Sequence, residues 1–363
     1  MCTINLTLPS WTTWNVILVA LWLSINLTRV GNCFVSAAID LSSVKRVTNL
    51  PIVSNRFIIE VDTTADIPSK RDTASLHERV YKSIKARGIG FRVDKEFDAN
   101  DLFVGAAVTL SDAKDAKPLE TSPGIKAIRP VTVFSRPDPI KFHVVTGADD
   151  PELPPETQST HILTGVDKLH AQGITGDGIK IGIIDTGIDY THPALGAGFG
   201  PGHKVIGGYD LVGDAYNGTN TPEPDDDPLD QCEGHGTHVA GIIGADPGTT
   251  PYNISGVAYS ASLSAYRVFG CNGTVTDDVL VEALIMGYRD GQDVLTLSIG
   301  GPNGWTESSS AVVASRIARA GKIVTIAAGN QGEYGSWYSS NPGNGIDVIS
   351  VASTVGRTGQ VEN

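Results

Sequence analysis

The chain has 363 residues, of which 40% are hydrophobic, and it carries a formal net charge of −13 at pH 7. This length and apolar content exclude a disordered chain and leave room for more than one domain. The negative charge argues against nucleic acid as a partner, because no basic stripe is available to neutralise phosphates.

Residues 1–38 are predicted to be a signal peptide. Residues 16–23 form an apolar core that is too short for a helix that spans a membrane. Small residues follow it, and the Val-Ser-Ala sequence at 35–37 suits cleavage before Ala38. No Lys or Arg precedes the core, so a retained anchor is the alternative. We therefore expect secretion without stable membrane association.

The sequence pattern of residues 39–135 predicts a small, separate α/β domain. Ser75 to Arg87 has apolar side chains at four-residue spacing, which is typical of an amphipathic helix. The expected element order is β-α-β-β-α-β, a split βαβ or ferredoxin-like arrangement. The elements are expected at residues 56–61, 75–87, 90–97, 102–110, from 113, and at 125–133.

Residues 136–160 contain several prolines and acidic residues, which prevent regular secondary structure. This composition predicts an exposed linker. We expect a maturation cut inside it.

Residues 161–363 alternate between helical patterns and apolar strands, which predicts a three-layer fold with helices on both faces of a parallel sheet. The strands are nearly continuous apolar runs, as expected for a sheet that is buried on both sides. Helices are expected at 161–172, 239–244, 277–289 and 308–320, and strands at 179–184, 262–268, 294–299, 323–327 and 348–352.

Two residues, Asp185 and His235, carry candidate chemistry. Asp185 follows an apolar strand, at the end where open α/β sheets place their functional groups. His235 lies between two glycines, ahead of a small and apolar run that predicts a buried helix. A lone histidine there is usually a core residue bonded to a backbone carbonyl. The aspartate favours a catalytic role instead.

The segments Ile183–Asp189, Gly234–Gly241 and Ala327–Asn330, in that order, resemble the subtilisin family of serine proteases, peptidase family S8. The resemblance implies that His235 is the general base, that Asp185 holds its tautomer, and that Asn330 donates to the oxyanion. It also implies that residues 39–135 are an inhibitory propeptide of the I9 type.

The family's nucleophile lies in a Gly-Thr-Ser-Met-like turn, and no such motif occurs between Asn330 and Asn363. We therefore expect the nucleophilic serine to lie beyond this chain, which by itself would be inactive. Cys271 and the Asp-Asp-Pro-Leu-Asp run before His235 resemble minor extracellular proteases of this family, which carry a protease-associated insertion. A truncated gene model or a fragment of a longer enzyme is the expected explanation.

The resemblance also implies a groove for an extended polypeptide substrate. Ser298, Ile299 and Gly300 match the strand that lines a substrate pocket. Gly270 and Gly273 match the edge that pairs with the substrate backbone, where glycine permits close approach.

Four cysteines bear on the compartment. Cys2 and Cys33 would leave with the signal peptide, and the resemblance places Cys232 and Cys271 on loops beside the active site. We predict a disulfide between this second pair, with two free buried thiols as the alternative. The N-glycosylation acceptors are Asn217, Asn253 and Asn272.

No cofactor or metal site is expected. His235 and His238 lack the i, i+4 spacing and the glutamate of a zinc protease helix, and His238 and His192 are interpreted as structural. Asp225 to Asp227 indicates a solvated loop, with calcium binding as the alternative.

The sequence therefore predicts a secreted, zymogen-type serine endopeptidase. One competing hypothesis is an inactive fragment or pseudoprotease that binds or inhibits another protease through residues 56–133. An α/β hydrolase of esterase type is disfavoured, because its Gly-x-Ser-x-Gly turn must precede the aspartate and histidine.

Overall fold

The computed structural model describes residues 50–64, 75–99, 102–137, 159–249, 254–332 and 338–353. The predicted signal peptide and nearly all of the predicted linker lie outside these ranges. The described residues all belong to one compact unit by their internal contacts.

The first part of this unit contributes four strands to a five-stranded antiparallel sheet, in the order β2-β3-β1-β4. The β-α-β-β-α-β order expected from the sequence is present, with a short second helix. Helix α2 begins with a capping box, in which Ser75 and Glu78 each accept the other's backbone N–H. That this domain acts as a propeptide stays a prediction. The elements are β1 (Ile52–Val61), α2 (Leu76–Ala86), β2 (Phe91–Ala99), β3 (Phe103–Leu110), α3 (Ala116–Leu119) and β4 (Ile125–Ser135).

The second part is a six-stranded parallel sheet with the order β13-β11-β9-β5-β7-β6. Its strands are β5 (Lys180–Asp185), β6 (Val205–Asp210), β7 (Ser262–Arg267), β9 (Val294–Leu297), β11 (Ile323–Ala327) and β13 (Ile349–Val351). The helices are α4 (Ser159–Thr164), α5 (Val166–His170), α6 (His235–Gly244), α7 (Asp277–Arg289) and α8 (Ser309–Arg319). Of the short strands, β8 (Thr274–Thr276) lies beside β4 as the fifth strand of the antiparallel sheet, and β10 (Gly301–Pro302) and β12 (Ser340–Asn341) form a separate two-stranded sheet.

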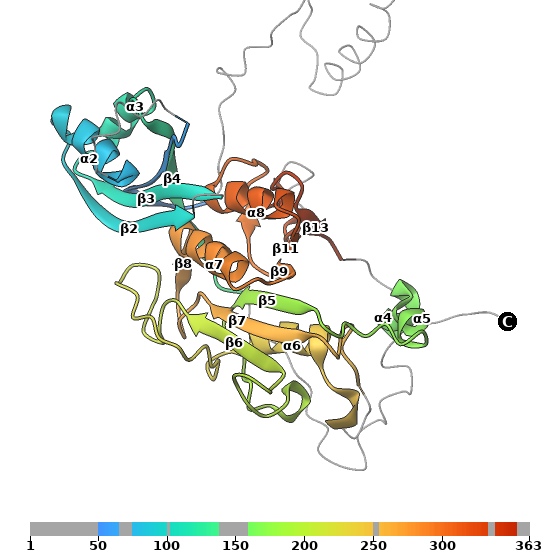
Figure 1. The fold of residues 1–363 in the computed structure, drawn as a ribbon. Coiled ribbons are helices and arrows are strands. Elements are labelled where there is room, and N and C mark those ends of the chain that lie inside the picture. Colours follow the sequence, from blue (N-terminus) through green and yellow to red (C-terminus); the bar gives the residue numbers. More distant parts are fainter. Residues whose placement is uncertain are drawn as a thin grey trace, which may run out of the picture. The chain divides into compact units, whose positions relative to one another are not determined.

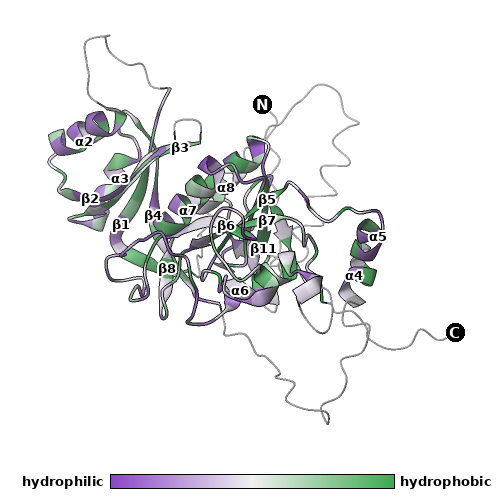
Figure 2. Cartoon of the chain, turned by 60° about the horizontal axis from the view of Figure 1, so that its bottom comes forward, coloured by the Kyte–Doolittle hydropathy of each residue, from purple (hydrophilic) through white to green (hydrophobic). Residues whose placement is uncertain are grey.

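Helices cover both faces of this sheet, as predicted. Ile183 packs in the core that contains Ala240 of α6, whereas its neighbour Ile184 packs in the core that contains α7 and α8. Successive side chains of a strand point to opposite faces, so the two cores lie on opposite sides of the sheet. Figure 2 shows the hydrophobic middle of the central strand β5, which contains three isoleucines.

The structure corrects some of the predicted boundaries. The helix expected at 161–172 is two helices, because Gly165 adopts a left-handed φ of 78° between α4 and α5. The strand expected at 294–299 ends at Leu297. Strands β6 and β8 were not predicted. Gly208 interrupts the apolar pattern of β6, yet it is needed there, since a Cβ would lie 2.0 Å from the carbonyl oxygen of Ala265.

Helices α7 and α8 lie between the two sheets, as Figure 1 shows. One hydrophobic core joins Ile58 and Phe103 of the antiparallel sheet to Leu280 and Ile317 of the helices. The last residues of β4 also pair antiparallel with β8, with Phe134 opposite Val275. The two sheets are therefore connected by a buried apolar contact and by backbone pairing.

Apolar side chains remain exposed on two parts of the second sheet layer. Ile349 and Val351 of the edge strand β13 are 54% and 53% exposed, and Ile242 of α6 is 55% exposed. Among the described helices, none has both the length and the apolar character required to cross a bilayer.

Candidate active site

Asp185 is the last residue of β5, a central strand of the parallel sheet. It is 1% exposed. Its Oδ1 accepts hydrogen bonds from Nδ1 of His235 at 2.7 Å and from the backbone N–H of Thr186 at 2.8 Å. The carboxylate is thus held at the carboxyl end of the sheet, where the sequence predicted it.

His235 is the first residue of α6 and follows Gly234, which has a left-handed φ of 84°. The next residue must be glycine, because a Cβ on Gly236 would lie 2.0 Å from the carbonyl oxygen of Gly187. This close approach brings the start of α6 against the end of β5. The two glycines that flank the histidine in the sequence therefore let its ring reach Asp185.

Two residues that were not predicted from the sequence hold the turn before α6. Asp230 is 2% exposed and accepts backbone N–H bonds from Cys232, Glu233 and Gly234. Thr186 donates its hydroxyl to Asp230 at 2.6 Å and accepts the N–H of Gly236 at 2.9 Å. These bonds fix the backbone on both sides of the histidine.

The electrostatics of the pair favour a basic histidine. Burial alone would lower the pKa of His235, but the hydrogen bond and the charge of Asp185 outweigh it, and the net shift is upward. Burial raises the pKa of the Asp185 carboxyl, and the same hydrogen bond opposes that rise. An ionised carboxylate only accepts, so Nδ1 of His235 carries the proton and Nε2 is the basic nitrogen.

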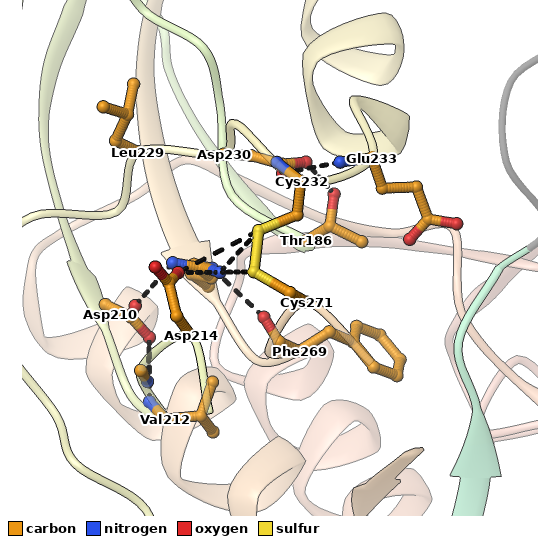
Figure 3. Close-up of polar contacts among 12 residues, drawn as sticks. Thr186, Asp210, Val212, Asp214, Leu229, Asp230, Cys232, Glu233, Phe269 and Cys271 are labelled. Atoms are coloured by element: carbon orange, nitrogen blue, oxygen red, sulfur yellow. Dashed lines mark hydrogen bonds and ion pairs between the residues drawn. A yellow bond between two sulfur atoms is a disulfide. The ribbon is translucent and has the colours of Figure 1, made fainter. Parts of the chain in front are cut away.

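Cys232 and Cys271 are joined by a disulfide, with Cα atoms 5.2 Å apart. Arg267, at 3% exposure, lies beside it and pairs with Asp210 at 3.0 Å and Asp214 at 2.7 Å. Figure 3 shows the disulfide between Asp210 and Asp214 on one side and Glu233 on the other. The side chain of Glu233 points away from the disulfide. The bridge ties the segment before His235 to the loop that follows β7.

Asn330 lies on an exposed segment after β11. In the described part of the chain it makes one hydrogen bond, from its backbone N–H to Oε1 of Gln331 at 3.2 Å. Its predicted oxyanion role stays a prediction.

The five predicted substrate-binding residues differ in accessibility. Ile299 is 2% exposed in the core, whereas Ser298 and Gly300 are half-buried. Gly273 is exposed with a φ of 93°. Gly270 is buried, and a Cβ there would lie 2.2 Å from the carbonyl oxygen of Tyr216, so this glycine serves loop packing. The edge that pairs with another strand is β8, slightly further along the chain.

The predicted glycosylation acceptors Asn217 and Asn272 are exposed on loops, and Asn253 lies outside the described residues. Their modification stays a prediction.

Of the two histidines interpreted as structural, His192 has a local capping role, whereas His238 does not pack in the core. Nδ1 of His192 accepts the N–H of Ala194 and so caps a short helical turn. His238 is exposed, and its pKa is lowered by partial burial and by the nearby charge of His235.

The acidic loop at 225–227 is hydrogen-bonded within the protein: Asp225 pairs with the backbone of Asp210, and Asp227 accepts from Tyr190. A cleft of about 920 Å³ adjoins the histidine turn and is lined by Asp230, Glu233, Thr237, His238 and Ile242, among others.

A family model described as "Subtilase family" matches residues 176–361, which include the β5 aspartate and the α6 histidine. The chain belongs to the subtilase family. It is 31% identical over 317 residues to the minor extracellular protease Vpr of Bacillus subtilis, a match that covers 87% of this chain and 37% of that protein. It is 38% identical over 175 residues to subtilisin DY of Bacillus licheniformis, covering 48% of this chain and 55% of that one.

The solved structure of fervidolysin from Fervidobacterium pennivorans, described as a keratinolytic enzyme related to subtilisin, matches with a TM-score of 0.53 and 20% identity. It covers 81% of this chain and 42% of that one, and confirms the subtilisin-like α/β fold with its parallel sheet. The chain thus spans about 37% to 55% of the length of Vpr, subtilisin DY and fervidolysin.

Proposed function

We propose that this chain is the N-terminal part of a secreted serine endopeptidase that hydrolyses peptide bonds in proteins. The observation that carries the proposal is the 2.7 Å contact between Asp185 and His235 at the end of β5, in a chain of the subtilase family. The relatives described as proteases support the same reaction class.

His235 acts as general base in this proposal. Its Nε2 takes the proton of a serine hydroxyl as the oxygen attacks the scissile carbonyl, and then returns the proton to the leaving amine. Asp185 keeps the proton on Nδ1 and stabilises the imidazolium that forms. Because the pKa of His235 is raised, activity falls as the pH drops below this raised value and the base becomes protonated.

The oxyanion of the tetrahedral intermediate is proposed to receive a hydrogen bond from the Asn330 side chain. The nucleophilic serine is proposed to come from a Gly-Thr-Ser turn outside residues 1–363. The matches are consistent with this proposal, because they cover only 37% of Vpr and 55% of subtilisin DY, and both relatives therefore have further residues outside the matched part. Exposed apolar side chains on β13 and α6 offer surfaces for further chain to pack against.

The substrate is proposed to be an extended polypeptide that adds a strand to β8 by β-augmentation. The chain's own β4 occupies that edge: Val133, Phe134 and Ser135 lie opposite Thr276, Val275 and Thr274. Residues 39–135 are therefore proposed to be an intramolecular inhibitor of the I9 type that blocks the substrate path. A maturation cut within 136–160 would remove it.

Secretion is supported by the disulfide, which persists in oxidising compartments, and by the extracellular location stated for the Vpr relative.

The proposal is tested by expressing the complete gene product and its His235→Ala variant with a denatured protein as substrate. We expect cleavage by the parent, none by the variant, and loss of activity with a serine-directed covalent reagent. A parent that cleaves nothing after maturation contradicts the proposal. Cleavage that persists in the variant contradicts the assigned base.

The second candidate function is an inactive protein that binds another protease through residues 56–133. The ion pairs that this domain makes with α7 and α8 of its own chain favour a domain that can bind the corresponding helices of another protease. They are Arg56 with Asp278 at 2.7 Å and Glu60 with Arg316 at 2.5 Å. If the complete product proves inactive, inhibition of a related subtilase by this chain is the corresponding test.

A further inference from the structure

Arg136 follows directly after strand β4, at the point where the chain leaves β8. Its Nε lies 2.8 Å from Oε2 of Glu233, and its Nη1 donates to the backbone carbonyl of Cys271. The arginine side chain is 20% exposed and that of Glu233 is 3% exposed. A basic side chain therefore enters a nearly enclosed acidic site.

Glu233 is unusual for a charged residue in a cleft. Both of its carboxylate oxygens are buried, and apart from the ion pair with Arg136 neither takes a hydrogen bond from the described residues. A buried carboxylate without hydrogen bonds is costly unless a cation lies against it. Glu233 therefore provides a site that requires a positive charge, two residues before His235.

The site is built to hold its shape. Glu233 follows Cys232, and the carbonyl acceptor belongs to Cys271, so the disulfide fixes both acceptors relative to each other. The backbone N–H of Glu233 is also bonded to the buried carboxylate of Asp230. A preformed pair of acceptors binds with less loss of conformational freedom than a flexible pair.

We propose that Glu233 and the Cys271 carbonyl form a subsite for a basic side chain of an extended peptide, and that Arg136 occupies it in this chain. That the peptide is a substrate rests on the proposed function. A peptide that pairs with β8 in the register of β4 places its next residue at this position. Arginine suits it better than lysine, because its forked guanidinium reaches the carboxylate and the carbonyl together.

Position separates this contact from the other ion pairs of the domain interface. Asp278 and Glu282, the partners of Arg56 and Lys95, lie on helix α7. Glu233 lies beside the candidate base and on the wall of the adjoining cleft. A contact made only for docking needs no buried acceptor at this place.

The first test uses the 363-residue chain and needs no catalysis. Arg136→Ala empties the subsite, and propylguanidinium is added as the probe. If it binds with a Kd on the order of 1 mM, 10 mM probe raises the Tm of this variant by about 2 °C. We expect no such rise with neutral propylurea, in the parent chain, or in the Arg136→Ala, Glu233→Gln double variant.

The matched control is Arg319→Ala, which removes an arginine from an ion pair of 2.7 Å whose partners are 57% and 53% exposed. We expect propylguanidinium to cause no rise in the Tm of this control variant, because the emptied site is open to water. Equal rescue in both variants, or none in Arg136→Ala, overturns the proposal. If Arg136→Ala does not fold, Arg136→Gln is used in the same way.

The second test uses the complete, matured gene product and a peptide library. Cleaved peptides should be enriched in arginine at one position on the acyl side of the cut. Replacing that arginine by neutral citrulline should lower kcat/KM about 10- to 100-fold, and Glu233→Gln should abolish the difference.

The two proposals fail in different ways. Cleavage with no preference for arginine, in an active enzyme, overturns the subsite and leaves the proposed function standing. Guanidinium rescue in a product that cleaves nothing supports the subsite and contradicts the proposed function.

Discussion

The contact between Glu60 and Arg316 offers a sharp test of how the two sheets are held together. Glu60 belongs to β1 and is 2% exposed, and Arg316 belongs to α8. Their atoms Oε1 and Nη2 are 2.5 Å apart. A hydrogen bond between charged groups contributes about 1.5 to 3 kcal/mol, so we expect a coupling energy in that range.

A double-mutant cycle with Glu60→Gln and Arg316→Met measures this coupling through the free energy of unfolding in urea. The cycle is needed because Lys126 and Arg129 contact the same carboxylate, and their contribution cancels between the two arms.

The matched control is the pair Lys117 and Glu120, which has a similar distance of 2.8 Å but is 83% and 48% exposed. Its coupling should be about 0.5 kcal/mol or less. A coupling between Glu60 and Arg316 no larger than the control refutes the reasoning.

The same pair has a defined pH dependence. Burial alone would raise the pKa of Glu60, but hydrogen bonds from Lys126 and Arg316 outweigh it and hold the pKa below 4.5. A lowered pKa in the folded state stabilises the protein above the unfolded value, and this stability is lost as the pH falls through the folded value. We expect constant coupling from pH 6 to 8 and a decline below about pH 4.5.

Three further predictions concern the active-site region. Gly236→Ala should destabilise the chain by about 1 to 3 kcal/mol or more in urea unfolding, because its Cβ would lie 2.0 Å from a backbone oxygen. Gly241→Ala in the same helix is the control: its Cβ would meet no atom within 4 Å, and we expect it to stabilise the chain by about 0.5 to 1 kcal/mol. Equal effects would contradict this packing. Asp185→Asn should lower the pKa of His235 in an NMR titration, because burial then acts without the carboxylate; an unchanged pKa would show that the contact carries no charge. Reduction of the disulfide, which spans 39 residues, should cost about 4 kcal/mol of unfolding free energy, and no loss would contradict a closed loop in the native chain.

The sequence predicted the elements that depend on local pattern. Asp185 could be placed because an apolar strand precedes it, and His235 because glycines and a small apolar run surround it. Both lie where those patterns indicated, and the contact between them is present. The resemblance of three motifs supplied their roles.

Features that depend on distant contacts were not predicted. Strand β6 contains Gly208. The need for a glycine at this position is evident only in the folded chain, where the carbonyl oxygen of Ala265 lies against it. Asp230 resembles any acidic loop residue until the turn before α6 folds around it. Arg136 and Glu233 lie far apart in the sequence, and only the pairing of β4 with β8 brings them together.

Proteolysis by the complete gene product tests the central claim most directly. The measurement is the rate of cleavage of a denatured protein by the matured product, with and without the His235→Ala substitution. We predict cleavage that depends on His235 and is abolished by a serine-directed reagent. A correctly folded, fully processed product that cleaves nothing would contradict this claim.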